Sequence, residues 1–175
     1  MPTIVIPFRG ADAKQRLPEE LRGVLAEAML ADVAAAANDL GPTLVAVGPG
    51  QGAAVTEALS DVRETPVLVV NADLPAATAR DLLTLLGSVP PEGIAVARAR
   101  DGTTNALGLA TPALFEPLYG PNSADRFLAL AASRLVEIPN LIDDVDTLQD
   151  LERIEGRLGP HTAGALEQLR EPSAT

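Results

Sequence analysis

The pattern of apolar and polar residues predicts strands and helices in alternation along the whole chain. Short apolar runs, typical of buried strands, occur at residues 3–8, 43–47, 67–70, 94–98, 106–110 and 135–138. The stretches between them predict helices at residues 18–38, 53–59, 76–86, 113–118, 124–133 and 148–157, and the tail from residue 167 is expected to fray. This alternation predicts an α/β fold in a single domain over residues 1–175, with a mostly parallel, doubly wound sheet and helices on both faces.

The apolar run Val67–Val70 ends in a segment with a candidate ligand. Three of its four residues are β-branched valines, and Asn71, Asp73 and Pro75 follow. Asp73 is therefore expected at the carboxyl end of a central strand, the edge of an open α/β sheet where ligands bind. A carboxylate there suits a divalent cation that carries the phosphates of a nucleotide. The alternative is that Asp73 caps a helix that begins near Ala76.

The composition of the chain excludes several classes of function. The 175 residues carry a net charge of −11, and the core is expected to be aliphatic because only 2% of residues are aromatic. This charge argues against a general nucleic-acid binder but allows a mononucleotide held by a metal ion and a few cations. The absence of cysteine and the single histidine, His161, exclude thiolate chemistry and a histidine metal cluster within the chain. No signal peptide or membrane-length apolar run is visible, which predicts a cytoplasmic protein.

The loop after the first strand carries Arg9, Lys14 and Arg16. Because it follows a strand, it is expected at the ligand-binding edge of the sheet, where cations neutralise phosphates and stabilise a leaving diphosphate. The loop lacks the G-x-x-x-x-G-K-[ST] pattern, so it is not a Walker A motif. The alternative for Lys14 and Arg16 is an ordinary solvated loop.

A second acidic element contains Asp144 and Asp146. In an extended segment, residues two apart face the same side, so both carboxylates are able to meet Asp73 and complete an oxygen-ligand site for Mg²⁺. The alternative is that Asp146 or Thr147 caps the next helix, with Thr147 and Asp150 as a pair of the capping-box type. Both can hold together, because the cap does not need both aspartates. The neighbouring Asp143 is interpreted as a solvated charge.

Two polar loops supply neutral hydrogen-bond donors. Thr103, Thr104 and Asn105 lie in the first loop, and Gly120 and Ser123 lie in the second. Donors of this kind near a helix N-terminus suit a small carboxylate or phosphate. The same residue types are common in turns, and Ser123 is also a candidate N-cap for the helix at residues 124–133.

A glycine-rich turn at residues 48–52 follows the second strand. Within it, Gly50, Gln51 and Gly52 would let a base or ribose approach the backbone closely, because glycine has no side chain. The turn does not match G-x-G-x-x-G, so a plain turn explains it equally well.

Six motifs, taken in order, resemble those of a known family. They are A-K-x-R-L at residues 13–17, G-Q-G-A-A-V at 50–55, N-A-D-L-P at 71–75, D-G-T-T-N-A-L at 101–107, Y-G-P-N-S at 119–123 and D-V-D-T at 144–147. The resemblance extends over residues 3–158. In this order the motifs are similar to those of the guanylyltransferases that make the phospholactyl or enolpyruvyl guanosine diphosphate precursor of the deazaflavin coenzyme F-420.

The resemblance implies a GT-A-like (Rossmann-like) nucleotidyltransferase fold. It also implies Mg²⁺-dependent transfer of GMP from GTP to 2-phospho-L-lactate, phosphoenolpyruvate or 3-phosphoglycerate, with release of pyrophosphate. The expected partners are GTP and the small phosphorylated acid, without nucleic acid or membrane, and a homodimer is left open. The matching residues imply metal ligation by Asp73, Asp144 and Asp146, catalysis by Lys14, Arg16 and Asp73, binding of the acid by Thr104 or Asn105 with Gly120 and Ser123, and nucleotide binding by Gly50, Gln51 and Gly52.

The sequence departs from the family's pattern in three places. The segment between Val47 and Val67 is shorter, Phe127 stands where the family's G-P-x-S-x-x-R-H has histidine, and Phe8-Arg9 ends the first strand where a lysine is common. Guanine preference and the acceptor acid are therefore the least defined properties. Two alternatives stay open: a related nucleotidyltransferase that loads a sugar phosphate or a pterin phosphate, and a non-catalytic nucleotide-binding protein.

Overall fold

A six-stranded sheet with the strand order β2-β1-β3-β5-β4-β6 lies at the centre of the molecule. The computed structural model describes residues 1–63 and 65–170. The strands are β1 (Thr3–Pro7), β2 (Thr43–Ala46), β3 (Val67–Val70), β4 (Ile94–Arg98), β5 (Thr104–Leu109) and β6 (Ser133–Val136). Only β5 among them runs antiparallel to its neighbours, β3 and β4. The predicted α/β fold with a mostly parallel sheet is confirmed.

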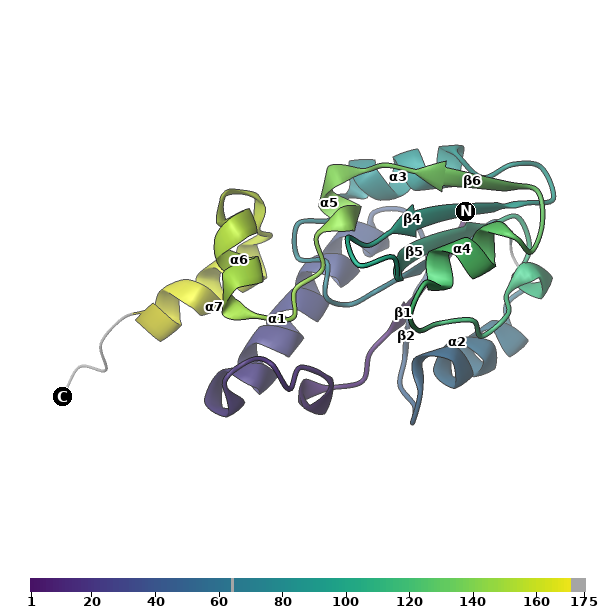
Figure 1. The fold of residues 1–175 in the computed structure, drawn as a ribbon. Helices are drawn as coiled ribbons and strands as arrows, with labels where there is room; N and C mark the ends of the chain where they lie inside the picture. Colours follow the sequence, from purple (N-terminus) through teal and green to yellow (C-terminus); the bar gives the residue numbers. More distant parts are fainter. Residues whose placement is uncertain (64, 171–175) are drawn as a thin grey trace.

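Helices cover both faces of this sheet, as Figure 1 shows. The described α-helices are α1 (Glu19–Asn38), α2 (Gln51–Ser60), α3 (Ala79–Gly87), α4 (Ser123–Leu128), α5 (Pro139–Ile142), α6 (Leu148–Ile154) and α7 (Pro160–Arg170). The described part of the chain also contains three short 3-10 turns, namely η1 (Ala11–Ala13), η2 (Pro112–Leu114) and η3 (Glu155–Arg157). None of the described helices is both long enough and apolar enough to cross a membrane.

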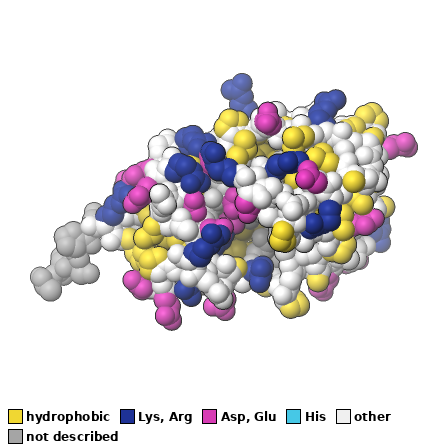
Figure 2. Space-filling model, in the orientation of Figure 1, with side chains coloured by type: hydrophobic (Ala, Val, Ile, Leu, Met, Phe, Trp, Pro, Cys, Tyr) yellow, Lys and Arg dark blue, Asp and Glu magenta, His cyan; other side chains and the backbone are white. Residues whose placement is uncertain are grey.

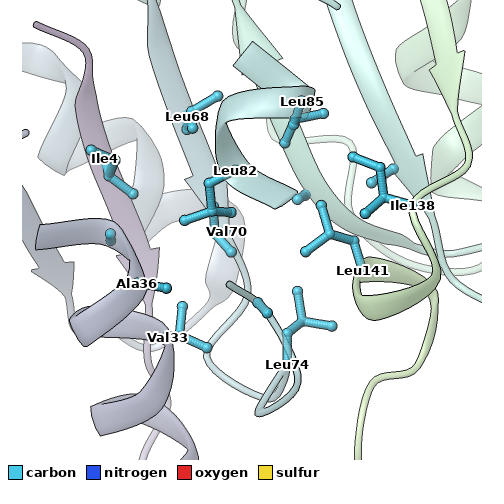
Figure 3. Packing of buried hydrophobic residues seen from close by; sticks show 14 of the residues in the cluster. Ile4, Val33, Ala36, Leu68, Val70, Leu74, Leu82, Leu85, Ile138 and Leu141 are labelled. Atoms are coloured by element: carbon cyan, nitrogen blue, oxygen red, sulfur yellow. The ribbon is translucent and has the colours of Figure 1, made fainter. Parts of the chain in front are cut away.

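Two aliphatic cores lie on opposite faces of the sheet. Alternate strand residues point to opposite faces, so Ile4 and Val70 pack with α1, α3 and α5 (Figure 3). Their neighbours Val5 and Val69 pack with α2 and α4 on the other face, around Phe127. Because both faces are covered, β3 is buried along its full length. This double burial is why its sequence is a continuous apolar run rather than an alternating one.

The C-terminal helices α6 and α7 form a smaller layer beside α1 (Figure 1). They enclose a third apolar cluster with the first half of α1, and Val145 and Ala76 contribute to it from the segments that leave the sheet. The segment at residues 143–147 therefore runs between the sheet and the C-terminal layer. Its side chains are positioned by both.

Helix α7 is anchored by a carboxylate from the middle of α1. Asp32 is 4% exposed and accepts hydrogen bonds from the backbone N–H groups of His161 (2.9 Å) and Thr162 (2.8 Å). A Cβ at Gly159 would lie 2.3 Å from Asp32 Cγ, so glycine is required for this approach. The sequence pattern did not predict α7, and the expectation of a frayed tail is wrong for residues 167–170, which are helical. Residues 171–175 lie outside the described residues.

Several predicted boundaries are wrong in ways that matter for the site. Helix α3 begins at Ala79 rather than near Ala76, because Thr78 and Asp81 form its capping box, so Asp73 does not cap it. Strand β5 begins at Thr104, two residues before the prediction. Ser123 lies inside α4, whose N-cap is Asn122 in the left-handed conformation.

Candidate active site

The segment after β3 is held by its neighbours on both sides. The Asn71 side chain accepts a hydrogen bond from Gln51 Nε2 (2.6 Å) and donates one to the carbonyl oxygen of Thr104 (3.1 Å). The carbonyl oxygen of Asp73 accepts the backbone N–H of Val145 at 3.0 Å. These bonds place the Asp73 carboxylate beside the segment that carries the second pair of aspartates.

Three carboxylates converge at this edge of the sheet. Asp73, Asp144 and Asp146 each offer an oxygen atom, and the three atoms lie within 4.8 Å of one another. Val145 between the two later aspartates is buried in the third apolar cluster, so its neighbours face the opposite way. Thr147 and Asp150 form the capping box of α6 at the same time. We call Asp73, Asp144 and Asp146 the acidic cluster.

Two cations of the N-terminal loop reach the acidic cluster. Lys14 Nζ contacts the Asp73 carboxylate and lies 2.8 Å from Asp146 Oδ1, and Arg16 pairs with the other oxygen of Asp146. Lys14 is 11% exposed, whereas Arg16 is 70% exposed. The structure therefore brings together Lys14, Arg16 and the acidic cluster, as the sequence predicted for this edge of the sheet.

The electrostatics of the acidic cluster favour a divalent cation. Burial, helped by the nearby charge of Asp73, raises the pKa of Asp144 to about 6 although a hydrogen bond from Asn105 opposes the rise. Burial would lower the pKa of Lys14, but the charges of Asp73 and Asp146 outweigh it and raise that pKa. Asp73 Oδ1 is buried and has no hydrogen-bond partner among the described residues. Three carboxylates, one of which has an unpaired buried oxygen, match the ligand preference of Mg²⁺.

A cavity of about 210 Å³ opens beside the acidic cluster. It runs from Lys14, Asp73 and Asp146 to the loop after β1 and to Gln51 at the start of α2. Figure 2 shows acidic and basic side chains intermixed in the middle of this face of the molecule. The lining of the cavity thus combines charged groups, including Arg9, with Phe8, Met29 and the amide pair Gln51–Asn71.

The candidate acid-binding residues form a second group. Thr104 at the start of β5 and Ser123 at the start of α4 share a hydrogen bond of 2.9 Å between their hydroxyl groups, and both residues are buried. Gly120 has a φ of +124°, which favours glycine, and its carbonyl accepts the Ser123 N–H at 3.1 Å. The two polar loops therefore meet, through Thr104 rather than Asn105.

Asn105 has a different position from Thr104. It is buried, and its side-chain amide donates to the carbonyl oxygens of Leu141 (2.9 Å) and Ile142 (3.2 Å) and to Asp144 Oδ1 (3.3 Å). Its donors are therefore committed to the segment that carries Asp144.

The glycine-rich turn contributes mainly Gln51 to the cavity. Gly50 is the N-cap of α2, and Gln51 lines the cavity. A Cβ on Gly52 would lie 2.7 Å from Pro117 Cβ, so this glycine allows close packing within the protein.

Sequence reasoning missed one charged group beside the site. Asp143, interpreted as a solvated charge, is 3% exposed and pairs with Arg100 (2.6 Å) and Arg157 (2.7 Å), with Arg153 at 3.7 Å. Burial alone would raise the pKa of Asp143, but hydrogen bonds and charges from Arg100 and Arg157 outweigh it and lower that pKa. The three arginines follow no sequence pattern, so nothing in the sequence indicated the cluster.

Comparison with known proteins found similar guanylyltransferases. A phosphoenolpyruvate guanylyltransferase of Sphaerobacter thermophilus is 40% identical over 51% of this chain, which spans about half (46%) of the relative's length. One of Roseiflexus sp. is 31% identical over 90% of this chain and 86% of the relative. A 2-phospho-L-lactate guanylyltransferase of Natrialba magadii is 32% identical over 70% of this chain and 68% of the relative. No protein-family model matches the chain.

Solved structures share the fold at low sequence identity. A candidate nucleotide-diphospho-sugar transferase from Desulfovibrio desulfuricans has a TM-score of 0.73 and 15% identity, covering 96% of this chain and 95% of its own. A nucleotidyl transferase from Methanothermobacter has a TM-score of 0.57 and 16% identity, covering 96% of this chain and 99% of its own.

The alignment with the Roseiflexus protein runs over 192 positions, more than the 175 residues of this chain, so that relative carries extra residues inside the aligned region.

Proposed function

Because the chain belongs to the family of phosphoenolpyruvate and 2-phospho-L-lactate guanylyltransferases, we propose that it transfers GMP from GTP to a phosphorylated three-carbon acid. The observation that carries the proposal is the acidic cluster with Lys14 and Arg16 beside a cavity. A triphosphate needs both a metal ion and cationic side chains to neutralise it. The acidic cluster supplies ligands for the metal ion, and Lys14 and Arg16 supply the cationic side chains. The product would be a precursor of coenzyme F-420.

The acidic cluster would hold Mg²⁺. Its three carboxylates supply hard oxygen ligands, and the unpaired Oδ1 of Asp73 is a buried acceptor that a cation would satisfy. When bound, the ion supplies positive charge that offsets the charge on the reacting phosphates.

The chain's own residues would act by binding and charge. An oxygen of the acceptor's phosphate forms a bond to the α-phosphorus of GTP, the bond from that phosphorus to the bridging oxygen breaks, and pyrophosphate leaves with the electron pair. The attacking phosphate is already an anion, so no general base is required. Lys14 and Arg16 would stabilise the charge that develops on the pyrophosphate. Holding both substrates in line supplies the rest of the rate enhancement.

The acceptor acid would bind at the second group of residues. The hydroxyl groups of Thr104 and Ser123 and the backbone N–H of Gly120 are neutral donors of the kind that fix a small carboxylate or phosphate. Asn105 is less suited to this role, because its amide already donates to three protein acceptors.

The test is pyrophosphate release from GTP and Mg²⁺ with 2-phospho-L-lactate, phosphoenolpyruvate or 3-phosphoglycerate, with ATP and CTP as controls. Release with GTP and one acid is the expected result, and it identifies the acceptor. Release only with a sugar phosphate or pterin phosphate would support a related nucleotidyltransferase. GTP binding without pyrophosphate release in the presence of any acceptor would support a non-catalytic nucleotide-binding protein.

Replacing the central carboxylate tests the site directly. Asp73→Asn removes a metal-ligating charge while keeping the shape of the side chain, so we expect at least a hundredfold loss of turnover with an unchanged fold. Circular dichroism and the unfolding midpoint check the fold. Asp61→Asn, at the C-cap of α2, is the matched control. Near-normal turnover of Asp73→Asn would refute the assignment of the metal site.

A further inference from the structure

The proposed reaction leaves the buried carboxylate of Asp143 without a role. Its Oδ1 accepts a hydrogen bond from Arg100 Nε at 2.6 Å, and its Oδ2 accepts one from an η nitrogen of Arg157 at 2.7 Å. Arg153 Nε lies 3.7 Å from Oδ1. A carboxylate held by several guanidinium groups has little freedom to move, because charge-assisted bonds of this kind are strong and directional.

These partners come from separate parts of the fold. Arg100 follows β4, Arg153 belongs to α6 and Arg157 to η3. Arg157 also donates to Asn140 Oδ1 (2.8 Å), and Asn140 donates to Asp81 Oδ2 (3.0 Å) in the capping box of α3. We call this set the Asp143 network, consisting of Asp81, Arg100, Asn140, Asp143, Arg153 and Arg157.

The Asp143 network is hydrogen-bonded at both segments that carry the acidic cluster. Asp143 directly precedes Asp144, so fixing one fixes the backbone of the other. Asp81 belongs to the capping box that ends the segment from Asp73. On the inner side, the backbone N–H of Val145 bonds to the carbonyl of Asp73. The spacing between the two acidic segments is therefore set by a chain of hydrogen bonds.

We propose that Asp143 is a positioning residue for the divalent-cation site of this protein, acting through the Asp143 network to hold Asp144 and Asp146 against Asp73. The inference rests on the proposed function, since it requires the acidic cluster to bind a cation. Residues that orient metal ligands change metal affinity when they are replaced, typically 10- to 100-fold. Among the described residues, removing the charge of Asp143 would also leave Arg100 and Arg157 without a carboxylate partner, whereas Arg153 keeps its ion pair with Asp150.

The experiment measures cation affinity rather than turnover. A fluorescent GTP analogue is titrated with Mn²⁺ in the presence of the complete chain, and the Mn²⁺ concentration for half-maximal binding is recorded. We expect this concentration to rise about tenfold or more in Asp143→Asn. Glu155→Gln is the matched control, because it removes an exposed ion pair with Arg170 on the same C-terminal layer and should leave the Mn²⁺ requirement unchanged.

The outcomes separate the inference from the proposed function. If the wild-type chain binds no GTP analogue with Mn²⁺, the proposed function fails and the inference with it. If the wild type binds and a folded Asp143→Asn variant needs no more Mn²⁺, Asp143 is merely structural and only the inference fails. Should Asp143→Asn not fold, Arg100→Gln decides, because Arg100 is 62% exposed and its loss leaves the core intact. An unchanged Mn²⁺ requirement in Arg100→Gln then overturns the inference, and a severalfold rise supports it.

Discussion

Lys14 is the only lysine of the chain, and its ammonium group lies between two carboxylates of the acidic cluster. The same carboxylates are the proposed ligands of the metal ion. A monovalent ammonium and a divalent cation therefore compete for the same oxygens. Binding of the metal would release Lys14 to contact the phosphates, so one residue serves the site before and after nucleotide binding.

This competition predicts opposite effects of one substitution. Lys14→Met should reduce turnover at least a hundredfold, because the leaving pyrophosphate loses a stabilising charge. The same variant should bind Mn²⁺ more tightly in the absence of nucleotide, since no ammonium occupies the carboxylates. Pyrophosphate release and calorimetric titration with Mn²⁺ measure the two effects. Arg63→Met, which removes an exposed cation outside the site, serves as control. Weaker Mn²⁺ binding in Lys14→Met would contradict the competition.

Asp144 gives the metal-free protein a pH-dependent stability. Its pKa in the folded chain is about 6, above the ordinary value of 3.8, because of burial and the charge of Asp73. The folded state therefore binds more protons than the unfolded state between these values, so stability falls as the pH rises from about 4 to about 6. Asp144→Asn should then be more stable than the wild type at pH 8, by about 1–3 kcal/mol, and nearly equal at pH 4. Urea unfolding without metal at both pH values measures the difference, and a difference independent of pH would refute the argument.

At the residue scale, the sequence predicted the acidic cluster more readily than the residues around it. Asp73 was predictable because it follows an apolar strand whose carboxyl end lies at the ligand edge, and Asp144 and Asp146 were predictable because residues two apart in an extended segment face the same side. Thr104 and Asn105 were not separable, because which of two adjacent residues meets Ser123 depends on the register of β5. Asp143 was misinterpreted because its arginine partners are scattered along the chain.

At the element scale, the sequence predicted the helix and strand boundaries that local residues determine, but not those that long-range contacts determine. The capping box of α6 was visible in the sequence as Thr147 and Asp150. Strand β5 begins earlier than its apolar run, because Thr104 pairs with Arg98 and the carbonyl of Asn105 accepts the Asn71 N–H. Helix α7 escaped prediction because its first N–H groups bond to a carboxylate 129 residues earlier. Tertiary contacts decided these boundaries.

That distant cap makes a prediction for the C-terminal layer. Asp32→Ala would leave the buried N–H group of Thr162 and the partly buried N–H group of His161 without their acceptor, so we expect a loss of about 2 kcal/mol in the free energy of unfolding. Because Asp32 is not among the residues that line the cavity, the affinity for GTP of the folded variant should stay unchanged. Urea unfolding and a GTP titration measure the two quantities. Glu27→Ala, on the exposed face of the same helix, is the control and should change stability little. Equal stability of the Asp32 variant would show that α7 is held by apolar packing alone.

At the scale of the whole molecule, the site is a meeting point of three separate segments. Lys14 comes from the loop before α1, Asp73 from the edge of the sheet, and Asp144 and Asp146 from the passage to the C-terminal layer. In the described residues, ionic contacts join the first segment to the other two at Asp73 and Asp146. In a chain with a net charge of −11, Lys14 and Arg16 thus supply positive charge where an anionic substrate would bind.

This arrangement predicts how the molecule responds to its nucleotide. GTP with Mg²⁺ would bind all three segments at once, so hydrogen exchange of the backbone amides at residues 9–17, 71–78 and 143–150 should slow together. Amides in β4 and in the strand Val67–Val70 are already protected by the sheet and should change little. Exchange measured by mass spectrometry, with and without GTP and Mg²⁺, tests this. Asp73→Asn should abolish the joint protection, because the loss of one ligand weakens the cation that links the segments. Slowing confined to the turn at residues 48–52 would instead indicate that the nucleotide binds by its base alone, away from the acidic cluster.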